Sequence, residues 1–462
     1  MSDQPNVVIV MADDLGFGDL GFYNYGATDT PAIDSIAHDG ISMTQHYSAS
    51  PICAPARAAF LTGRYPQRSG VIDTFPHLEL DRMALHEKTI GDLFTEAGYA
   101  TGMVGKWHNG SLGMRYHPNR RGFSEFVGFR GGGQDYWDWL LDRNGTPFKS
   151  DGRYLTDVFT DEAVSFIKRH EDERFLLALN YTAPHGPFQA PADDLAAVSG
   201  RDGFPDVVNT IAAMVGVMDR GIARVLDQLE ISGIADDTLV MFTSDNGPWQ
   251  RIGSFQETTA RYNLGFAGGK EFVSEGGIRV PMFLRWPGVI ADGRVVHDVA
   301  HFTDWVPTLL SVIGQPDLAR LDGDGVDLWP MLTGGSVHVP GVRCWQWSRY
   351  EPIGTINAAV RDGNWKLMYP AVDAILQIRK ADQIEERRMR ANPGEYVLPQ
   401  WMSVPSYVAD LTPPKPQLFD VVADPGEKLD LAAQYPAKAS KLEATLADWY
   451  DEMEMERSSL FE

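Results

Sequence analysis

Short runs of consecutive apolar residues recur along the first three quarters of the chain. Runs such as Val7–Val10 lack the alternation of polar and apolar residues that marks a half-exposed strand, so both faces of these strands are expected to be buried. The runs predict strands at Asn6–Met11, Ala100–Val104, Phe175–Asn180, Thr238–Thr243 and Met282–Arg285.

The segments between these strands place apolar residues at helical spacing. They predict helices at Ala32–Asp39, Thr89–Ala97, Asp157–Arg169 and Asn209–Leu229. Repetition of strand, helix and strand favours a parallel sheet covered by helices on both faces. The predicted fold class is therefore α/β, with a large mixed, mostly parallel sheet between helices.

The last quarter has a different pattern. Residues 358–368 resemble a hairpin whose turn is Asp362–Asn364, and Pro436–Glu456 has the pattern of one amphipathic closing helix. We place a boundary near residue 340, after the Gly- and Pro-containing stretch Leu332–Gly341. The predicted units are a catalytic domain at 1–340 and a smaller α+β subdomain of antiparallel strands and one helix at 341–462.

Residues 371–416 form a charged and then Pro-containing excursion from this pattern. Its middle, Asp382–Arg390, predicts a surface helix. We favour a solvated face for this helix over a functional role.

Composition excludes several classes of protein. The 462 residues are 44% hydrophobic and 22% charged, as in ordinary globular proteins. The formal net charge is −23, from 40 basic and 63 acidic residues, which argues against non-specific binding of nucleic acid. An anionic substrate would need a strongly positive local pocket.

Two cysteines, Cys53 and Cys344, exclude a disulfide framework. The N-terminus lacks the regions of a secretory signal peptide, and no apolar run reaches the roughly 18 to 20 residues of a membrane span. We therefore expect a soluble, cytoplasmic protein.

Reactive side chains follow four of the predicted strands directly. Singly, each has an ordinary structural explanation, such as a turn or a helix cap. Because ligands bind outside the carboxyl ends of strands in open α/β sheets, their shared position predicts one functional crevice. These residues are Asp13, Asp14, Lys106, His108, His185, Asp245 and Asn246.

Four of these residues offer only oxygen ligands. They are Asp13, Asp14, Asp245 and Asn246. Hard divalent cations prefer such ligands, whereas softer metals favour His or Cys. The set therefore predicts a site for a hard divalent cation, Ca²⁺ or Mg²⁺.

A short helix is predicted after Cys53. Pro55 suits its first turn, Ala56–Leu61 continue it and Gly63 suits its end. Cys53 would then lie at the positive end of the helix, where the pKa of a thiol is lowered and anions bind, with Arg57 one turn further on. The alternative is a buried structural cysteine.

Several motifs, in the right order, resemble those of type I sulfatases, the formylglycine-dependent, arylsulfatase-like branch of the alkaline-phosphatase-like superfamily. Cys53-Ala-Pro-Ala-Arg57 with Thr62-Gly-Arg64 resembles the signature C-x-P-x-R and T-G-R, with Ala56 where the family often has Ser. Further matching blocks are Met11–Asp19, Gly98–His108, Gly268–Lys270, Glu275–Pro281 and Leu418–Leu431.

The resemblance implies an alkaline-phosphatase-like fold and a specific chemistry. Cys53 would be oxidised to formylglycine by a formylglycine-generating enzyme, and the hydrated aldehyde would attack the sulfur of a sulfate ester. Ca²⁺ would be held by Asp13, Asp14, Asp245 and Asn246 and would also contact the hydrate at position 53.

The resemblance also assigns roles to the charged side chains around Cys53. Arg57 and Lys106 would surround the hydrate, and Lys270 and His185 would face the ester oxygen. His108 would take the proton of the second hydroxyl as sulfate leaves. The substrate would be an aryl or carbohydrate sulfate.

Two other functions stay open. One is a formylglycine-dependent phosphodiesterase or phosphonate monoester hydrolase, and the other is a non-catalytic protein that binds sulfated glycans. Tyr136, Trp137, Trp139 and Trp249 either stack on a ligand or simply pack. The sequence does not indicate an oligomeric state.

Overall fold

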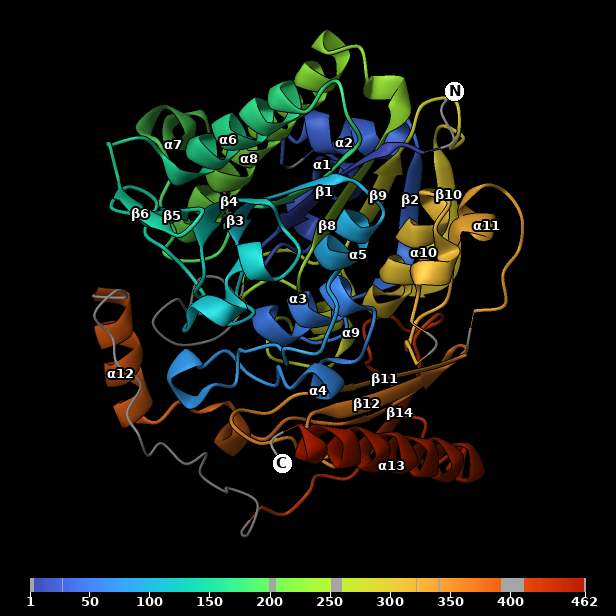
Figure 1. Ribbon diagram of the computed structural model, residues 1–462. Helices are drawn as coiled ribbons and strands as arrows, with labels where there is room; N and C mark the ends of the chain where they lie inside the picture. The colour runs from blue at the N-terminus through green and yellow to red at the C-terminus, as the bar shows by residue number, and fades with distance from the viewer. Residues whose placement is uncertain are drawn as a thin grey trace.

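The computed structural model describes residues 4–26, 28–198, 205–250, 260–320, 322–339, 341–391 and 411–460. Its main feature is a ten-stranded sheet with the order β10-β2-β9-β8-β1-β7-β3-β4-β5-β6 (Figure 1). The strands are β1 (Asn6–Ala12), β2 (Ile41–Tyr47), β3 (Ala100–Lys106), β4 (Glu125–Phe129), β5 (Leu140–Arg143), β6 (Thr146–Lys149), β7 (Phe175–Asn180), β8 (Thr238–Ser244), β9 (Met282–Arg285) and β10 (Arg294–His301).

The centre of this sheet is parallel. Strands β8, β1, β7, β3 and β4 pair in parallel, as do β10 and β2. β9 pairs antiparallel with both neighbours, and β5 and β6 add an antiparallel edge. The predicted mixed, mostly parallel sheet is confirmed.

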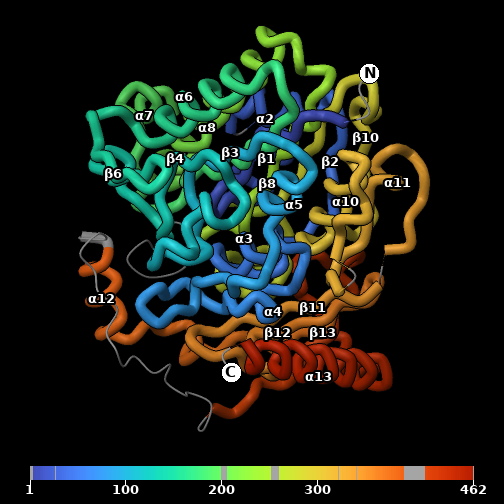
Figure 2. Tube along the Cα trace, in the orientation of Figure 1, coloured from blue at the N-terminus to red at the C-terminus, as the bar shows by residue number. Residues whose placement is uncertain are grey.

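Strand β1 explains why the central strands lack a polar face. Val7, Ile9 and Met11 belong to one hydrophobic core, and Val8 and Val10 belong to a second core on the other face. Helices cover both faces, so each side chain of the strand is buried (Figures 1 and 2).

The predicted helices are confirmed, with ends that differ by at most three residues. α2, α6 and α8 pack on one face of the sheet, and α3, α5 and α10 pack on the other. Their bounds are α2 (Pro31–His38), α3 (Cys53–Thr62), α5 (Ile90–Glu96), α6 (Leu155–Arg169), α8 (Asp206–Ile231) and α10 (Trp305–Val312). Shorter helices are α1 (Gly21–Asn24), α4 (Pro66–Ser69), α7 (Ala192–Val198), α9 (Glu275–Ile278) and α11 (Trp329–Leu332).

A second sheet follows residue 341. It has the antiparallel order β11-β12-β13-β14, and α13 (Pro436–Ser459) lies along it at the bottom of Figure 1. Leu442 and Leu446 of α13 pack on this sheet. The strands are β11 (Val342–Gln346), β12 (Ala358–Asp362), β13 (Trp365–Tyr369) and β14 (Gln417–Asp420).

The predicted hairpin is formed by β12 and β13, with Gly363 in the turn at φ 60°. The proposed division into residues 1–340 and 341–462 places this whole sheet in the second unit.

The charged segment 371–416 contains α12 (Lys380–Ala391), so the helix predicted there is confirmed. Residues 392–410 of this segment lie outside the described part. Among the helices of the described residues, none combines the length and the apolar composition that a membrane crossing requires.

Candidate active site

The reactive residues meet where four neighbouring parallel strands end. β8, β1, β7 and β3 are adjacent in the sheet, and Asp245, Asp13 and Lys106 stand at or just beyond the ends of three of them. All three side chains are fully buried. The predicted gathering of reactive side chains at the strand ends is therefore present in the fold.

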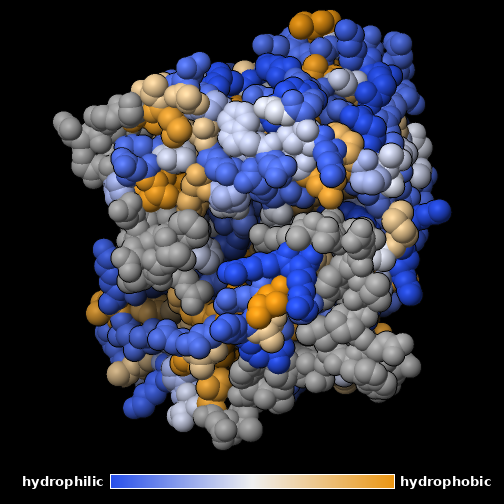
Figure 3. All heavy atoms as spheres, turned by 90° about the vertical axis from the view of Figure 1, so that its left-hand side faces the viewer, coloured by the Kyte–Doolittle hydropathy of each residue, from blue (hydrophilic) through white to orange (hydrophobic). Residues whose placement is uncertain are grey.

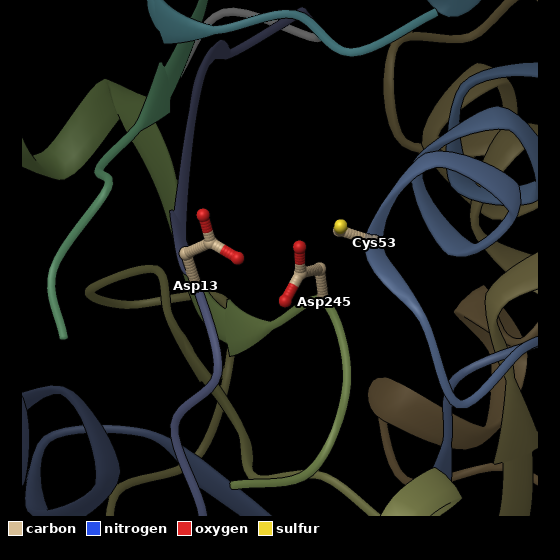
Figure 4. Close-up of side chains that lie close together, drawn as sticks. All are labelled: Asp13, Cys53 and Asp245. Carbon is tan, nitrogen blue, oxygen red and sulfur yellow. The ribbon is translucent and has the colours of Figure 1, made fainter. Parts of the chain in front are cut away.

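Helix α3 carries Cys53, whose side chain faces the carboxylates of Asp13 and Asp245 (Figure 4). Ile52 is the extended N-cap, Cys53 is the first helical residue, and Gly63 ends the helix in the left-handed conformation at φ 70°. The predicted end of the helix at Gly63 is confirmed. Glycine suits this position because it adopts positive φ without a steric penalty. The thiol and one carboxylate oxygen each of Asp13 and Asp245 lie within 4.8 Å of one another.

Two cations hold the carboxylates of Asp13 and Asp245. Lys106 Nζ lies 2.6 Å from Asp13 Oδ2. The Arg57 guanidinium binds Asp245 Oδ2 through Nε at 2.9 Å and Nη2 at 2.8 Å. These charge-assisted contacts fix both carboxylates beside Cys53.

A second cluster forms around Asp14. Lys270 Nζ lies 2.7 Å from Asp14 Oδ1, and Asn246 Nδ2 donates to the same oxygen at 2.8 Å. His185 Nε2 lies 3.8 Å from Asp14 Oδ2, while its Nδ1 lies 2.7 Å from the Gly186 carbonyl oxygen. Burial is the largest single effect and opposes ionisation, but the charge and hydrogen bond of Lys270, together with His185 and Lys106, outweigh it and hold the pKa of Asp14 well below its usual range.

The oxygen atoms fit a hard divalent cation. Asp13 Oδ1 and Asn246 Oδ1 are buried and have no hydrogen-bond partner among the described residues. Burial and the Asp245 carboxylate raise the pKa of Asp13 to about 7, and a cation beside it would oppose both effects. Besides the oxygens, the cluster contains His185, whose ring nitrogen approaches Asp13 and Asp14 within 4.8 Å.

The thiol of Cys53 differs from the sequence expectation. Its position at the first turn of α3 predicted a lowered pKa, but the pKa of Cys53 is raised. Burial is the largest cause, and it outweighs the nearby Lys106 and Lys270 charges. The expectation of a lowered pKa is therefore wrong, because it considered the helix terminus and not the burial of the side chain.

His108 is held in a strained, neutral state. Its φ of 55° lies in the left-handed region, and neither ring nitrogen has a hydrogen-bond partner among the described residues. Burial and the Lys106 charge lower the pKa of His108 well below its usual range. Burial and Lys270 do the same for the pKa of His185.

Sequence reasoning missed Asn180, which ends β7 at the same edge of the sheet. Its Nδ2 donates to the Lys106 carbonyl oxygen at 3.0 Å, and Arg57 Nη1 donates to the same oxygen at 3.2 Å. Asn180 therefore holds the backbone that presents Lys106. Its place at a strand end was the available signal.

The aromatic residues divide into two groups. Tyr136 and Trp139 are buried, and they donate to the carbonyl oxygens of His185 and Arg153. Trp137 is 39% exposed, and the Trp249 ring lies 5.8 Å from Lys270 Nζ. Packing thus accounts for Tyr136 and Trp139, whereas Trp137 and Trp249 keep the alternative of stacking on a ligand.

The two sheets and the site at the strand ends define an alkaline-phosphatase-like fold. The structure of the PsFucS1 sulfatase from Pseudoalteromonas sp. shares this fold, with a TM-score of 0.73 at 24% identity over 98% of this chain and 91% of that chain. A family model described as Sulfatase matches residues 5–315, so the chain belongs to the sulfatase family. It is an enzyme of the class that hydrolyses sulfate esters.

Named relatives agree with this assignment. Arylsulfatase J of Mus musculus is 30% identical over 96% of this chain and 75% of its own length. N-acetylgalactosamine-6-sulfatase of Canis lupus familiaris is 34% identical over 72% of this chain and 67% of its own length. The structure of Ps i-CgsB in complex with k-i-k-neocarrahexaose matches with a TM-score of 0.79 at 28% identity, over 96% of this chain and 92% of that chain.

Proposed function

We propose that this sulfatase uses a formylglycine made from Cys53, together with a bound Ca²⁺, to hydrolyse aryl or carbohydrate sulfate esters. The observation that carries the proposal is the position of the Cys53 thiol, within 4.8 Å of carboxylate oxygens of Asp13 and Asp245. The raised pKa of that thiol keeps it protonated and a poor nucleophile, so we assign the attack to a hydroxyl of the hydrated aldehyde and not to sulfur. A hydrated aldehyde supplies a hydroxyl nucleophile and a second hydroxyl on the same carbon.

The proposed metal ligands are Asp13, Asp14, Asp245 and Asn246, with position 53 beside them. The unpartnered Asp13 Oδ1 and Asn246 Oδ1 support this assignment, and a bound Ca²⁺ or Mg²⁺ would supply a Lewis acid for a sulfate oxygen. His185 would stay outside the ligand set, because its Nδ1 contact with Gly186 and its place beside Lys270 suit the leaving-group side.

In the proposed mechanism, residues of the chain transfer protons and stabilise charge at separate steps. Asp245 accepts the proton of the attacking hydroxyl, and Lys106 and Arg57 hold positive charge around that hydroxyl. The Lys270 ammonium stabilises or protonates the ester oxygen as its bond to sulfur breaks, and His185 acts there as an acid only after it takes up a proton, because its pKa is lowered. His108, which is neutral and has free ring nitrogens, takes the proton of the second hydroxyl when sulfate is eliminated. Covalent catalysis of this kind replaces one difficult step by two easier ones.

A formylglycine-dependent phosphodiesterase is the second candidate. Phosphate diesters also present a tetrahedral anion to a pocket lined with cations, so the geometry suits both esters. The names of the relatives favour sulfate. We therefore expect an aryl sulfate to be hydrolysed with a higher kcat/KM than the matching aryl phosphate diester. The opposite order, measured side by side on one preparation, would replace the proposal by the second candidate.

The leaving group is proposed from the same comparisons. One relative is named for N-acetylgalactosamine 6-sulfate, and one similar structure contains an oligosaccharide, which together support carbohydrate sulfates. Arylsulfatase J supports aryl sulfates. A panel of sulfated sugars assayed beside phenyl sulfate separates the two classes.

A further inference from the structure

A groove of about 580 Å³ lies next to the catalytic centre. The loop Gly131–Gly133 forms one side, and Glu386 and Met389 of α12 form part of the other. The volume falls within the range of small-molecule sites. Figure 3 shows the side of the molecule that carries α12, and this mostly hydrophilic surface is hollowed near its centre.

The glycine loop that lines the groove also approaches the two catalytic histidines. A Cβ on Gly132 would lie 3.0 Å from His108 Nε2, and a Cβ on Gly133 would lie 3.3 Å from His185 Cε1. His108 is 1% exposed, and no described residue hydrogen-bonds either of its ring nitrogens. The loop thus approaches both imidazoles while it lines the groove, so only the thickness of this glycine loop separates the groove from the catalytic histidines.

Helix α12 is fixed as a wall of the groove. Asp382, Glu386 and Met389 lie on one face of the helix, because residues three and four apart are neighbours there. Asp382 is fully buried and accepts from Tyr350 Oη at 2.7 Å. His77 Nε2 lies 3.1 Å from its other oxygen. One face of α12 is therefore fixed by buried contacts, while the other described side chains of this surface helix are exposed or half-buried.

The described residues that line the groove carry more negative than positive charge. Four are carboxylates and one is the guanidinium of Arg130, which donates to the Gly113 carbonyl oxygen at 3.4 Å. The carboxylates are Asp135, Asp138, Asp142 and Glu386. Backbone N–H groups of Trp137 and Asp138 donate to Asp135, and His117 contacts Asp142 at 3.1 Å, which favours the ionised forms.

The rest of the lining is largely apolar, with Phe129, Leu141 and Met389 among its members. Apolar surface beside carboxylate acceptors suits a ring that has an apolar face and donates hydrogen bonds from hydroxyl groups. A second anionic group on that ring would meet, among the described lining residues, four carboxylates and only one cation, the guanidinium of Arg130.

We infer that this groove holds the leaving group of the sulfate ester and that its carboxylates select an uncharged leaving group over one that carries a second anionic group. The inference rests on the proposed function and deepens it. Cations at the catalytic centre bind the sulfate group that is cleaved, and the carboxylates that line the groove repel any further anionic group on the substrate.

The test compares phenyl sulfate with meta-carboxyphenyl sulfate as paired probes. The readout is the ratio of their kcat/KM values in the wild type, in Asp138→Asn, in Glu386→Gln and in the double variant. Comparing ratios between variants removes the intrinsic difference in reactivity of the two esters. We expect the preference for phenyl sulfate to fall about threefold for each carboxylate removed, as for partly exposed charges, and to fall as ionic strength rises.

Asp448→Asn is the control, because it removes one exposed carboxylate from α13, a helix that does not line the groove. Its ratio should equal that of the wild type. An unchanged ratio in the double variant, or an equal fall in the control, would overturn the inference while the sulfatase assignment stands. If neither probe were hydrolysed by the formylglycine-bearing enzyme, the proposed function would fail, and this inference with it.

Discussion

At the residue scale, the two lysines of the site, Lys106 and Lys270, bind different carboxylates. Lys106 binds Asp13 beside Cys53, and Lys270 binds Asp14 on the side of His185. Both ammonium groups are buried, where fixed charges act on a reacting ester more strongly than in water. In the proposed mechanism the two lysines therefore serve opposite ends of the bond that breaks.

Replacing either lysine should slow turnover without removing the site. We expect Lys106→Ala and Lys270→Ala each to lower kcat by about 10²–10³, because each removes charge stabilisation of the transition state. Asp448→Ala, at an exposed position of α13, should leave the rate unchanged. Near-wild-type rates in both lysine variants, measured with phenyl sulfate, would exclude them from the mechanism.

The two cysteines give a sharper contrast. Cys53→Ala should fold and lack sulfatase turnover, whereas Cys344→Ala, which removes a buried thiol of the second sheet, should stay active. Cys53→Ser should be sulfated once and then stop, because serine has no second hydroxyl on its reacting carbon. Burst kinetics with mass analysis measures this, and multiple turnovers by Cys53→Ser would contradict elimination as the release step.

At the element scale, α8 offers a matched pair of glycines on one helix. A Cβ on Gly216 would meet no atom within 4 Å, whereas a Cβ on Gly221 would lie 2.4 Å from Thr160 Oγ1 and 2.8 Å from Tyr181 Oη. Gly216→Ala should stabilise the protein by about 1 kcal/mol, since alanine favours the helix.

Gly221→Ala should lower stability, because α8 would be pushed away from α6 and β7. The measurement is the midpoint of thermal unfolding for the two variants and the wild type. A rise for Gly221→Ala, or a fall for Gly216→Ala, would show that the helix packs differently.

The central strands could be predicted from the sequence because burial on both faces leaves an unbroken apolar run, as in β1. β2 could not, since Ser42 and His46 are buried beside apolar neighbours and interrupt its pattern. β10 alternates irregularly at a shift of register between Val296 and Val299. Such polar positions are accommodated by tertiary contacts that local pattern does not contain.

The residues of the site could be predicted from strand ends and motifs, but their pairing could not. Nothing local to Lys106 indicates that it binds Asp13 rather than Asp14. The inner face of α12 depends on His77 and Tyr350, which are distant in sequence from Asp382. These contacts arise only when separate segments fold together.

At the scale of the whole molecule, the site differs from the rest of the chain in charge. The protein carries a formal −23, yet around Cys53 the carboxylates of Asp13, Asp14 and Asp245 are matched by the cations of Arg57, Lys106 and Lys270. A bound divalent cation would therefore make the site positive. Such a local charge is what a sulfate ester needs in order to approach an acidic protein.

Metal removal should accordingly abolish activity. We expect a chelator to stop turnover, and added Ca²⁺ or Mg²⁺ to restore it and to raise the midpoint of thermal unfolding, because the ion would bind the folded state. Zn²⁺ alone should not restore turnover. Recovery with Zn²⁺ only would indicate that His185 or His108 is a ligand, and would contradict the all-oxygen site.

The central claim is that turnover depends on a formylglycine at position 53. The most direct measurement is mass spectrometry of the peptide that contains Cys53, made on the same preparations whose active-site turnover is assayed. We predict that the aldehyde replaces the thiol and that turnover rises in proportion to the modified fraction, reaching zero where only the thiol is found. Full turnover by a preparation whose Cys53 is entirely an unmodified thiol would contradict the account.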